Sequence, residues 1–425
     1  MSITKVFMVN TKGMGVEDSL VDRLDHLWKH EDVGLKDWIK EGEIVAIKTH
    51  FGSRNQTRHL RPMYIRKIVD LVREAKGIPW VCEGVGLFRD EGNREFTMSN
   101  GPGFISLANR HGFNIGALNA PVVMDDGIIG TEVFRVPNEK GKYIKEVAMA
   151  MGLRIADKVL IVSRFKGHDG AGFGGALKQL GIGCVGNEGK GAAHMGGGEN
   201  VYVKNPDNCT GCRKCLKICP TQALSLDENQ KISLDSNKCI ACTSCFAKCH
   251  VDIPPQELEE KRIFALRRRI PSVEQVERMM DNAAGVVKGI NSDGDDRLRF
   301  INIAVDITSH CDCMSAGGNL LVPDQGILYS TDPIAIDQAS VDLVTKAPGI
   351  PESPAETGLD SPHGRIDPIP EAMEPNNPKF GLLSRFVDPK SRPIIVETQL
   401  AAAHAQGIGS RDYELIDLTP KKGKK

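Results

Sequence analysis

The chain contains the stretch Cys209-Thr210-Gly211-Cys212-Arg213-Lys214-Cys215-Leu216-Lys217-Ile218-Cys219-Pro220, whose cysteines follow the spacing C-x2-C-x2-C-x3-C-P. The same cysteine spacing returns 30 residues later, at Cys239, Cys242, Cys245 and Cys249. Three thiolates two residues apart can wrap one iron–sulfur cube in a tight loop, while the fourth lies beyond it. The paired runs therefore predict a bacterial-type ferredoxin unit with two [4Fe–4S] clusters.

The repeat also predicts crossed ligation, because in two-cluster ferredoxins the fourth cysteine of each run binds the other cluster. The expected first ligand set is Cys209, Cys212, Cys215 and Cys249. The expected second set is Cys239, Cys242, Cys245 and Cys219. A zinc site uses four ligands, often as two C-x2-C pairs, and a disulfide framework suits short secreted chains. Both alternatives fit two runs of four cysteines less well.

Length and composition limit the class of protein. The chain has 425 residues, a net charge of −1 and 5% aromatic residues. This length suits two or three domains, and the near-neutral charge argues against a nucleic-acid surface. The basic residues over 261–269 lie in a stretch with a helical pattern, which is typical of a solvated helix face.

The sequence predicts a cytoplasmic protein that does not enter a membrane. The first residues lack the charged and apolar regions of a signal peptide, and no apolar run approaches the length of a membrane span. Twelve cysteines without an export signal indicate a reducing compartment, where thiolates stay available for iron.

Short apolar runs alternate with helical patterns on both sides of the cysteine-rich segment. We expect strands at 43–48, 78–82, 157–163, 300–306 and 327–330, and helices at 61–76, 144–151, 272–290 and 335–345. This alternation predicts an α/β domain with a mainly parallel sheet flanked by helices.

The predicted domain organisation is one α/β domain interrupted by a smaller one. The α/β domain is expected to comprise residues 1–202 and 256–425, with a small α+β ferredoxin-type domain inserted at 203–255. The proline-rich segment 347–393 has little periodicity and predicts a long loop over the surface.

A glycine-rich segment follows the expected strand that ends at Ser163. It reads Lys166-Gly167-His168-Asp169-Gly170-Ala171-Gly172-Phe173-Gly174-Gly175-Ala176-Leu177-Lys178. A glycine-rich loop between a strand and a helix can bring backbone N–H groups against an anion. Gly172, Gly174 and Gly175 are therefore candidates for binding a cofactor. The alternative is a tightly turning surface loop, since the segment matches neither a Rossmann fingerprint nor a Walker loop.

Four cysteines lie outside the repeat, namely Cys82, Cys184, Cys311 and Cys313. Cys311 and Cys313 follow an expected strand end, which is where ligands gather in α/β sheets. Together with Cys184 they are candidates for a third metal site. The alternative is that these are buried apolar cysteines, which is the favoured interpretation for Cys82.

Histidines and lysines near expected strand ends and in the glycine-rich region suggest a polar cleft. The candidates for catalytic groups are His50, Lys166, His168, Lys178 and His194. A histidine in such a position can equally be a satisfied structural residue.

Several stretches resemble a family of uncharacterised iron–sulfur centre proteins, defined by domain of unknown function 362. They are Ile47–Gly52, Arg61-Pro62, Lys166–His168 with Gly174–Lys178, Ser309–Cys313, Ser330–Ala339 and Gly407–Glu414. The resemblance spans nearly the whole chain, including the internal ferredoxin, and implies a single interrupted α/β domain. It implies no particular reaction.

The leading functional hypothesis is an anaerobic-type oxidoreductase or electron-transfer component. Electrons would pass between a redox partner protein and the α/β cleft through the two clusters, and would reach a small-molecule substrate, a flavin or a third metal centre. One alternative is a carrier that delivers metal or a cluster to another enzyme. Another is a protein that binds a small anion and has redox-sensing clusters. Cluster potentials span a wide range, so the direction of electron flow stays open.

Overall fold

The computed structural model describes residues 3–420, except for 17, 88–96, 169, 251–252, 254–256, 293, 295, 316, 352 and 354–391. Within this part of the chain, eight strands form one large sheet, in the order β16-β1-β15-β14-β7-β2-β3-β4. Their bounds are β1 Thr4–Asn10, β2 Ile44–Lys48, β3 Ile78–Glu83, β4 Val122–Met124, β7 Lys158–Arg164, β14 Leu298–Ala304, β15 Gly326–Ser330 and β16 Tyr413–Asp417. The predicted loop over 347–393 lies outside the described residues from 354 to 391.

The sheet is mainly parallel, as predicted. Strand β15 lies antiparallel between β1 and β14, whereas every other neighbouring pair is parallel. Seven of these eight strands therefore run in one direction. The carboxyl ends of β2, β3, β4, β7 and β14 meet at one edge, which is where ligands bind in open α/β sheets.

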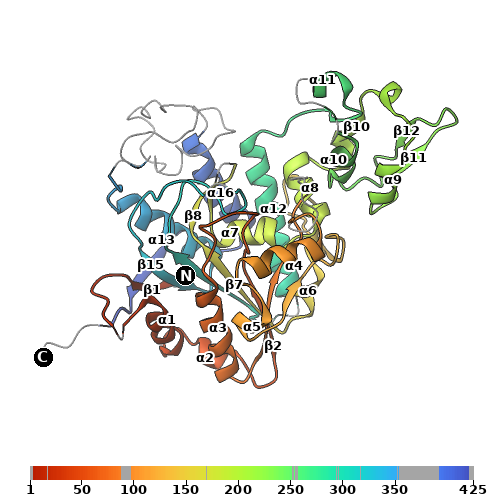
Figure 1. Ribbon diagram of the computed structural model, residues 1–425. Helices are drawn as coiled ribbons and strands as arrows, with labels where there is room; N and C mark the ends of the chain where they lie inside the picture. The colour runs from red at the N-terminus through yellow and green to blue at the C-terminus, as the bar shows by residue number, and fades with distance from the viewer. Residues whose placement is uncertain are drawn as a thin grey trace, which may run out of the picture.

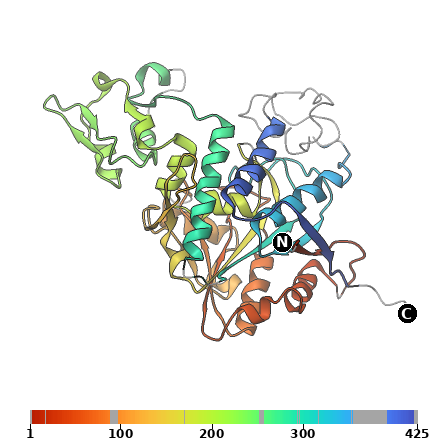
Figure 2. The same ribbon diagram turned by 180° about the vertical axis from the view of Figure 1, so that it is seen from behind.

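Side chains alternate between the two faces of the sheet and enter two separate cores. In β7, Val159 and Ile161 pack into the first core, and Leu160 and Val162 pack into the second. The helices over the first core are α12 (Ser272–Ile290), α13 (Pro333–Lys346) and α16 (Arg392–Gln406). Those over the second are α1 (Leu20–Lys29), α3 (Pro62–Glu74) and α4 (Gly101–Arg110). The two layers are visible on opposite sides of the sheet (Figures 1 and 2).

Helix α3 fixes the loop that follows β2. It begins at Pro62, whose restricted φ suits the first helical position and whose missing N–H is not needed there. Ile65, Ile68, Val69 and Val72 recur at helical spacing and are fully buried. Each such side chain contributes roughly 1.5–3 kcal/mol by leaving water. The anchored helix thus holds the preceding loop, including His50, over the carboxyl edge of the sheet.

The prediction of a helix over 144–151 is wrong. Glu146–Ala150 form strand β6, which pairs antiparallel with β5 (Val133–Pro137). A short apolar run fits a helix or a strand equally well by its periodicity, and tertiary packing decides between them. Here α12 packs closely against β6. A Cβ at Gly285 of α12 would lie 2.4 Å from a methyl carbon of Val147 of β6.

The cysteine-rich segment forms a small lobe that projects from one end of the molecule (Figure 1). Its elements are β10 (Val201–Val203), α9 (Lys214–Ile218), the hairpin β11 (Leu224–Leu226) and β12 (Ile232–Leu234), α10 (Ser244–His250), α11 (Leu258–Lys261) and β13 (Phe264–Leu266). We call residues 201–266 the cysteine lobe. Strand β13 pairs antiparallel with β10 and replaces the helical pattern expected over 261–269. The division of the chain at 203 and 255 stays a prediction.

The cysteine lobe packs closely on helix α8 (Asn187–Met195) of the α/β domain. A Cβ at Gly191 would lie 2.4 Å from the carbonyl oxygen of Ile240, and one at Gly198, three residues beyond the end of α8, would lie 2.0 Å from that of Cys239. Both distances are far below van der Waals contact. The second cysteine run therefore rests directly on α8, and glycine is what permits this approach.

Replacing Gly191 with alanine is expected to destabilise this contact by about 1–3 kcal/mol, because the new methyl group has no space. Gly116→Ala is a matched control, since Gly116 is exposed on the short helix α5 (Ile115–Leu118). A Cβ at Gly116 would lie 3.3 Å from the side-chain oxygen of Asn114, so this substitution should change stability by less than about 0.5 kcal/mol. Thermal unfolding of both variants tests this, and equal effects of the two substitutions would contradict the close contact at Gly191.

Candidate functional site

The two cysteine runs fold into loops with the same backbone conformation. Gly211 and Ala241, which occupy equivalent positions, have φ values of 67° and 53°, and Arg213 and Thr243 have values of 63° and 59°. In both loops the amide at the first of these positions donates to the first cysteine sulfur at 3.4 Å. Amide hydrogen bonds to sulfur favour the thiolate, and they shift the reduction potential of a bound iron–sulfur cluster.

The fourth cysteine of each run lies near the other loop. Burial and the three thiols of the first loop raise the pKa of Cys249 to about 12. Burial also raises the pKa of Cys239, and Cys219 is among the thiols that add to this effect. Like charges act in this way at short range. The donor set therefore fits two groups of four thiolates, since bound iron would offset the repulsion within each group.

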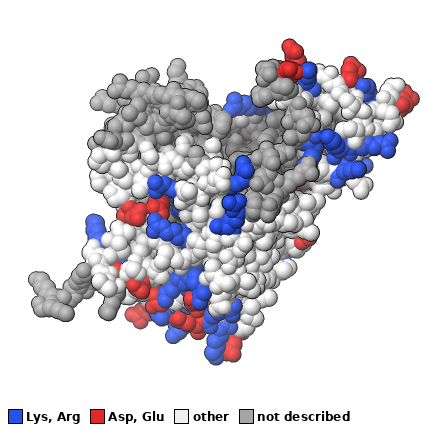
Figure 3. All heavy atoms as spheres, in the orientation of Figure 1, with Lys and Arg blue, Asp and Glu red and all other residues white. Residues whose placement is uncertain are grey.

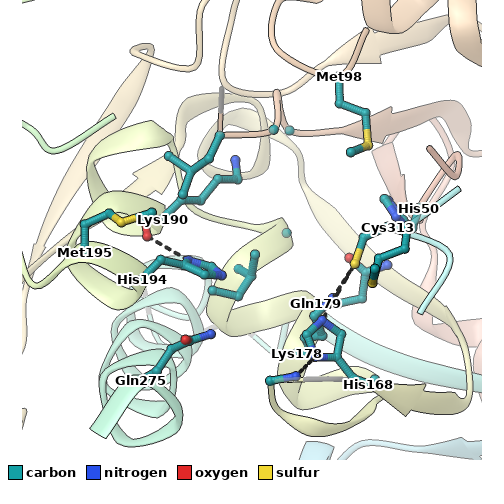
Figure 4. Close-up of a pocket in the computed structure, with 18 of the residues that line it drawn as sticks. His50, Met98, His168, Lys178, Gln179, Lys190, His194, Met195, Gln275 and Cys313 are labelled. Carbon is teal, nitrogen blue, oxygen red and sulfur yellow. Dashed lines mark hydrogen bonds between the residues drawn. The ribbon is translucent and has the colours of Figure 1, made fainter. Parts of the chain in front are cut away.

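A cavity of about 460 Å³ lies where the cysteine lobe meets the carboxyl edge of the sheet. The predicted site residues on its wall are His50, Lys166, His168, Gly174, Gly175, Lys178, His194 and Cys313. His194 lies on α8 with Met195, across the cavity from His50 and Cys313 (Figure 4). Thr243, from the second cysteine loop, lines the same cavity. One space therefore connects the cysteine lobe with the sheet edge.

The carboxylate of Glu83, the last residue of β3, contacts the side chains of Lys48 and His50 at this edge of the sheet. Its Oε1 lies 2.5 Å from Lys48 Nζ, and its Oε2 lies 2.6 Å from His50 Nδ1. Although burial alone would raise it, Lys48 and His50 lower the pKa of Glu83 to about 2. Since Nδ1 of His50 is engaged by the carboxylate, Nε2 is the nitrogen left for the cavity. Among the described residues, this buried Nε2 has no hydrogen-bond partner.

A second group of buried charges lies beside the cavity, beyond β4, and its Lys190 lines the cavity wall. Lys190 of α8 bonds Asp126 at 3.0 Å. Burial raises the pKa of the adjacent Asp125 to about 7, although Lys48 opposes the change. Neither carboxylate oxygen of Asp125 has a hydrogen-bond partner among the described residues. Burial therefore favours the protonated form of Asp125.

Cys184 belongs to this second group and does not join Cys311 and Cys313, so the predicted set of three cysteines is not brought together. Burial raises the pKa of Cys184 to about 12, with Lys48 opposing and Asp125 adding to the shift. Cys184 follows the π-helical turn η1 (Gln179–Gly183), which carries it behind the cavity wall. Cys82 is fully buried in the first core.

The third side chain beside Cys311 and Cys313 is His168, where Cys184 was expected. The ligand atoms of His168, Cys311 and Cys313 all lie within 4.8 Å of one another. Cys313 Sγ is 3.7 Å from His168 Nε2, and Lys178 Nζ is 3.4 Å from Cys311 Sγ and 4.0 Å from Cys313 Sγ. Burial raises the pKa of Cys311 to about 12. Cys313 lies at the cavity wall, whereas Cys311 is buried behind it.

Asp312, between these two cysteines, is held by two cations. It is fully buried and pairs with Lys166 at 3.1 Å and with Arg164 at 3.4 Å. Burial would raise the pKa of Asp312, but Lys166 and Arg164 hold it well below its usual range. The ion pairs fix the C-x-C turn against the end of β7.

The glycine-rich segment differs in detail from an open anion cradle. The start of α7 (Ala176–Lys178) is already capped, because the amides of Ala176 and Leu177 donate to the Asp337 carboxylate at 2.9 and 2.8 Å. Gly172 faces away from the cavity and packs on α16, where a Cβ would lie 2.7 Å from a Val396 methyl carbon. Only the roles of Gly174 and Gly175, at the cavity wall, stay as predictions for ligand binding.

Residues 45–342 match the profile of a family described as Domain of unknown function (DUF362). The chain belongs to the DUF362 family. The match covers most of the chain and confirms the resemblance noted from the motifs.

The cysteine-rich part of this DUF362 protein is similar to known iron–sulfur proteins. It is 47% identical over 53 residues to a ferredoxin of Pyrobaculum islandicum, covering 12% of this chain and 49% of that protein. It is 33% identical over 59 residues to pyruvate synthase subunit PorD of Methanocaldococcus jannaschii, covering 14% of this chain and 69% of the subunit. The chain thus spans about half the length of the ferredoxin it matches. These similarities indicate an iron–sulfur segment of the ferredoxin type.

Among solved structures, the DUF362 protein is similar to the lactate racemase apoprotein of Thermoanaerobacterium thermosaccharolyticum. The two chains are 12% identical, with a TM-score of 0.35, over 71% of this chain and 51% of the other. A similarity this slight carries no argument about function. In the part of the DUF362 chain that the structure describes, every helix is too short or too polar to cross a bilayer.

Sequence reasoning missed several residues that shape the site, including Glu83, Asp125, Asp126, Arg164 and Lys190. Arg164 and Glu83 are charged residues that end otherwise apolar strands. A charged residue at the carboxyl end of an expected parallel strand indicates a ligand site, so these two residues could have been recognised from the sequence.

Proposed function

We propose that this DUF362 protein is an electron-transfer oxidoreductase in which two [4Fe–4S] clusters exchange electrons with a small molecule bound in the cavity. The observation that carries the proposal is the single cavity, lined both by Thr243 of the second cysteine loop and by His50, His168 and Lys178 at the sheet edge. The eight thiols would hold the clusters in the crossed arrangement, and the clusters would supply single electrons.

The cavity wall supports binding of an anionic small molecule. Lys178 and Lys166 present ammonium groups there. Lys166 is already paired with Asp312, whereas Lys178 has the two thiols as its neighbours. Lys178 is thus the better placed cation for a bound anion. His50 would accept a proton at Nε2, because its Nδ1 is held by Glu83.

The outer surface of the cysteine lobe supports docking of a redox partner protein. Arg213, Lys214 and Lys217 are exposed around the first cysteine loop, where Cys212 is also exposed. Figure 3 shows Lys and Arg side chains gathered on the part of the lobe that carries α9. A basic surface beside a cluster would steer an acidic partner to it. PorD is named as a subunit of pyruvate synthase, and we propose a comparable role for this lobe, passing electrons to or from another protein.

Purification without oxygen tests the proposed function. Two [4Fe–4S] clusters predict about eight iron and eight acid-labile sulfide per chain, together with an EPR signal after reduction. Flavin fluorescence after denaturation would show whether a flavin is the electron acceptor. A colourless protein without acid-labile sulfide would overturn the proposal.

A further inference from the structure

We infer that Cys311 and Cys313 form a redox-active dithiol that exchanges an electron pair with the clusters. This inference rests on the proposed function and names the group that first receives or gives electrons in the cavity. It is carried by the arrangement of the two sulfurs, by the charges around them, and by the hydrogen bonds that orient His168.

The two thiols have the unequal exposure that suits a thiol–disulfide couple. Cys313 lies at the cavity wall, where a reactant can approach it, and Cys311 is buried beside it. Their sulfurs lie within 4.8 Å of each other. The turn between them is anchored through Asp312, so the pair is held at the sheet edge. An accessible thiol with a buried partner is able to open and close a disulfide by exchange.

Positive charges around the pair partly offset burial, which favours the thiol form of Cys311. Arg164, Lys166 and Lys178 bring three positive charges, and Asp312 brings one negative charge. While both sulfurs stay protonated, this excess positive charge disfavours binding of a divalent cation. The ammonium of Lys178, close to both sulfurs, instead stabilises a thiolate as it forms.

His168 is oriented as a hydrogen-bond donor to sulfur. Its Nδ1 lies 3.0 Å from the amide nitrogens of both Gly170 and Ala171, and these amides donate to it. Since Nδ1 accepts, the proton of the neutral ring lies on Nε2, which faces Cys313 Sγ at 3.7 Å. A metal ligand would need a lone pair at Nε2. The geometry of His168 therefore supports an imidazole–thiol pair.

The electron count of the couple matches the two clusters. Oxidation breaks the S–H bonds of Cys311 and Cys313 and forms one S–S bond. Two electrons would leave, one to each oxidised [4Fe–4S] cluster, and two protons would pass to solvent. Reduction is the reverse of this step, with the electrons supplied by the reduced clusters.

The test uses the full-length protein purified without oxygen and equilibrated in dithiothreitol buffers of graded potential. Thiols are alkylated, and peptides are analysed by mass spectrometry while EPR follows the clusters. We expect Cys311 and Cys313 to be alkylated at low potential and to be linked, with loss of two hydrogens, at high potential. Cys313→Ser should abolish the linkage and keep the cluster signals. Cys82→Ala is the matched control, because Cys82 is buried in the first core, and it should titrate like the wild type.

Coupling is tested by photoreducing the clusters of the oxidised protein without added thiol. The expected result is the appearance of one pair of alkylatable thiols at 311 and 313 as the cluster EPR signal decays. If the clusters are present and reducible but the pair never forms a disulfide, the inference fails and the proposed function stands. If a metal other than cluster iron is bound stoichiometrically and is lost in Cys313→Ser, the inference is also overturned. If no acid-labile sulfide is present, the proposed function itself fails.

Discussion

Replacing Cys219 with alanine is expected to eliminate the cluster of the second cysteine loop, although Cys219 belongs to the first run in sequence. The reason is that Cys219 lies among the thiols of the second loop, just as Cys249 lies among those of the first. A [4Fe–4S] cube that loses one of four thiolate ligands is expected to be lost on purification. Iron and sulfide should therefore fall by about half, from roughly eight to roughly four of each per chain.

Double substitutions identify which cluster is lost. Cys219→Ala combined with Cys239→Ala removes two ligands of the same cluster, so iron should again fall only by about half. Cys219→Ala combined with Cys209→Ala removes one ligand from each cluster, so almost all iron should be lost. Uncrossed ligation predicts the opposite pair of results. Iron and sulfide assays with EPR distinguish the two schemes, and circular dichroism checks that the variants are folded.

Lys48→Met is expected to destabilise the protein by about 3–5 kcal/mol, because it removes one partner of a buried ion pair. Lys48 is fully buried and Glu83 is 3% exposed. The substitution leaves the Glu83 carboxylate with His50 as the side chain at hydrogen-bond distance. Lys36→Met is the matched control, since Lys36 is exposed on α2 (Leu35–Trp38), and it should change stability by less than about 0.5 kcal/mol. Urea unfolding without oxygen measures both values.

The same variant should alter the acid side of the stability profile. The pKa of Glu83 is lowered from 4.5 to about 2 in the folded protein, with Lys48 as the main lowering influence against the opposing effect of burial. The ionised form therefore stabilises the fold above pH 4.5, and this contribution is lost as the pH falls toward 2. Without Lys48 this loss should be smaller. An unchanged acid profile, or a destabilisation below about 1 kcal/mol, would contradict the role given to the pair.

Strands β2, β3, β7 and β14 were predictable because each is a short, largely apolar run, whereas the three-residue strand β4 was not expected. β2, β7 and β14 lie within a residue or two of their expected positions. Strand β6 was not predictable, because its apolar run fits both periodicities and its state depends on α12, which lies far along the chain. Local sequence carries no information about such a contact.

The sequence predicted most of the residues that line the cavity, but it predicted less well which of them contact one another. His50, Lys166, His168, Lys178, His194 and Cys313 all lie at one cavity. The separation of Cys184 from Cys311 depends on the π-helical turn at 179–183, which no spacing rule predicts. The pairing of Glu83 with Lys48 likewise joins two strand ends that only the sheet order brings together.

The pairing of β10 with β13 means that the chain enters and leaves the cysteine lobe at adjacent points, with Val203 opposite Phe264. Neighbouring strands are only about 5 Å apart, so a tight turn would suffice to close the host domain without the lobe. An insertion with such close ends disturbs its host little. We therefore expect that the α/β sheet with its cavity would still fold if the cysteine lobe were replaced by a tight turn between β10 and β13.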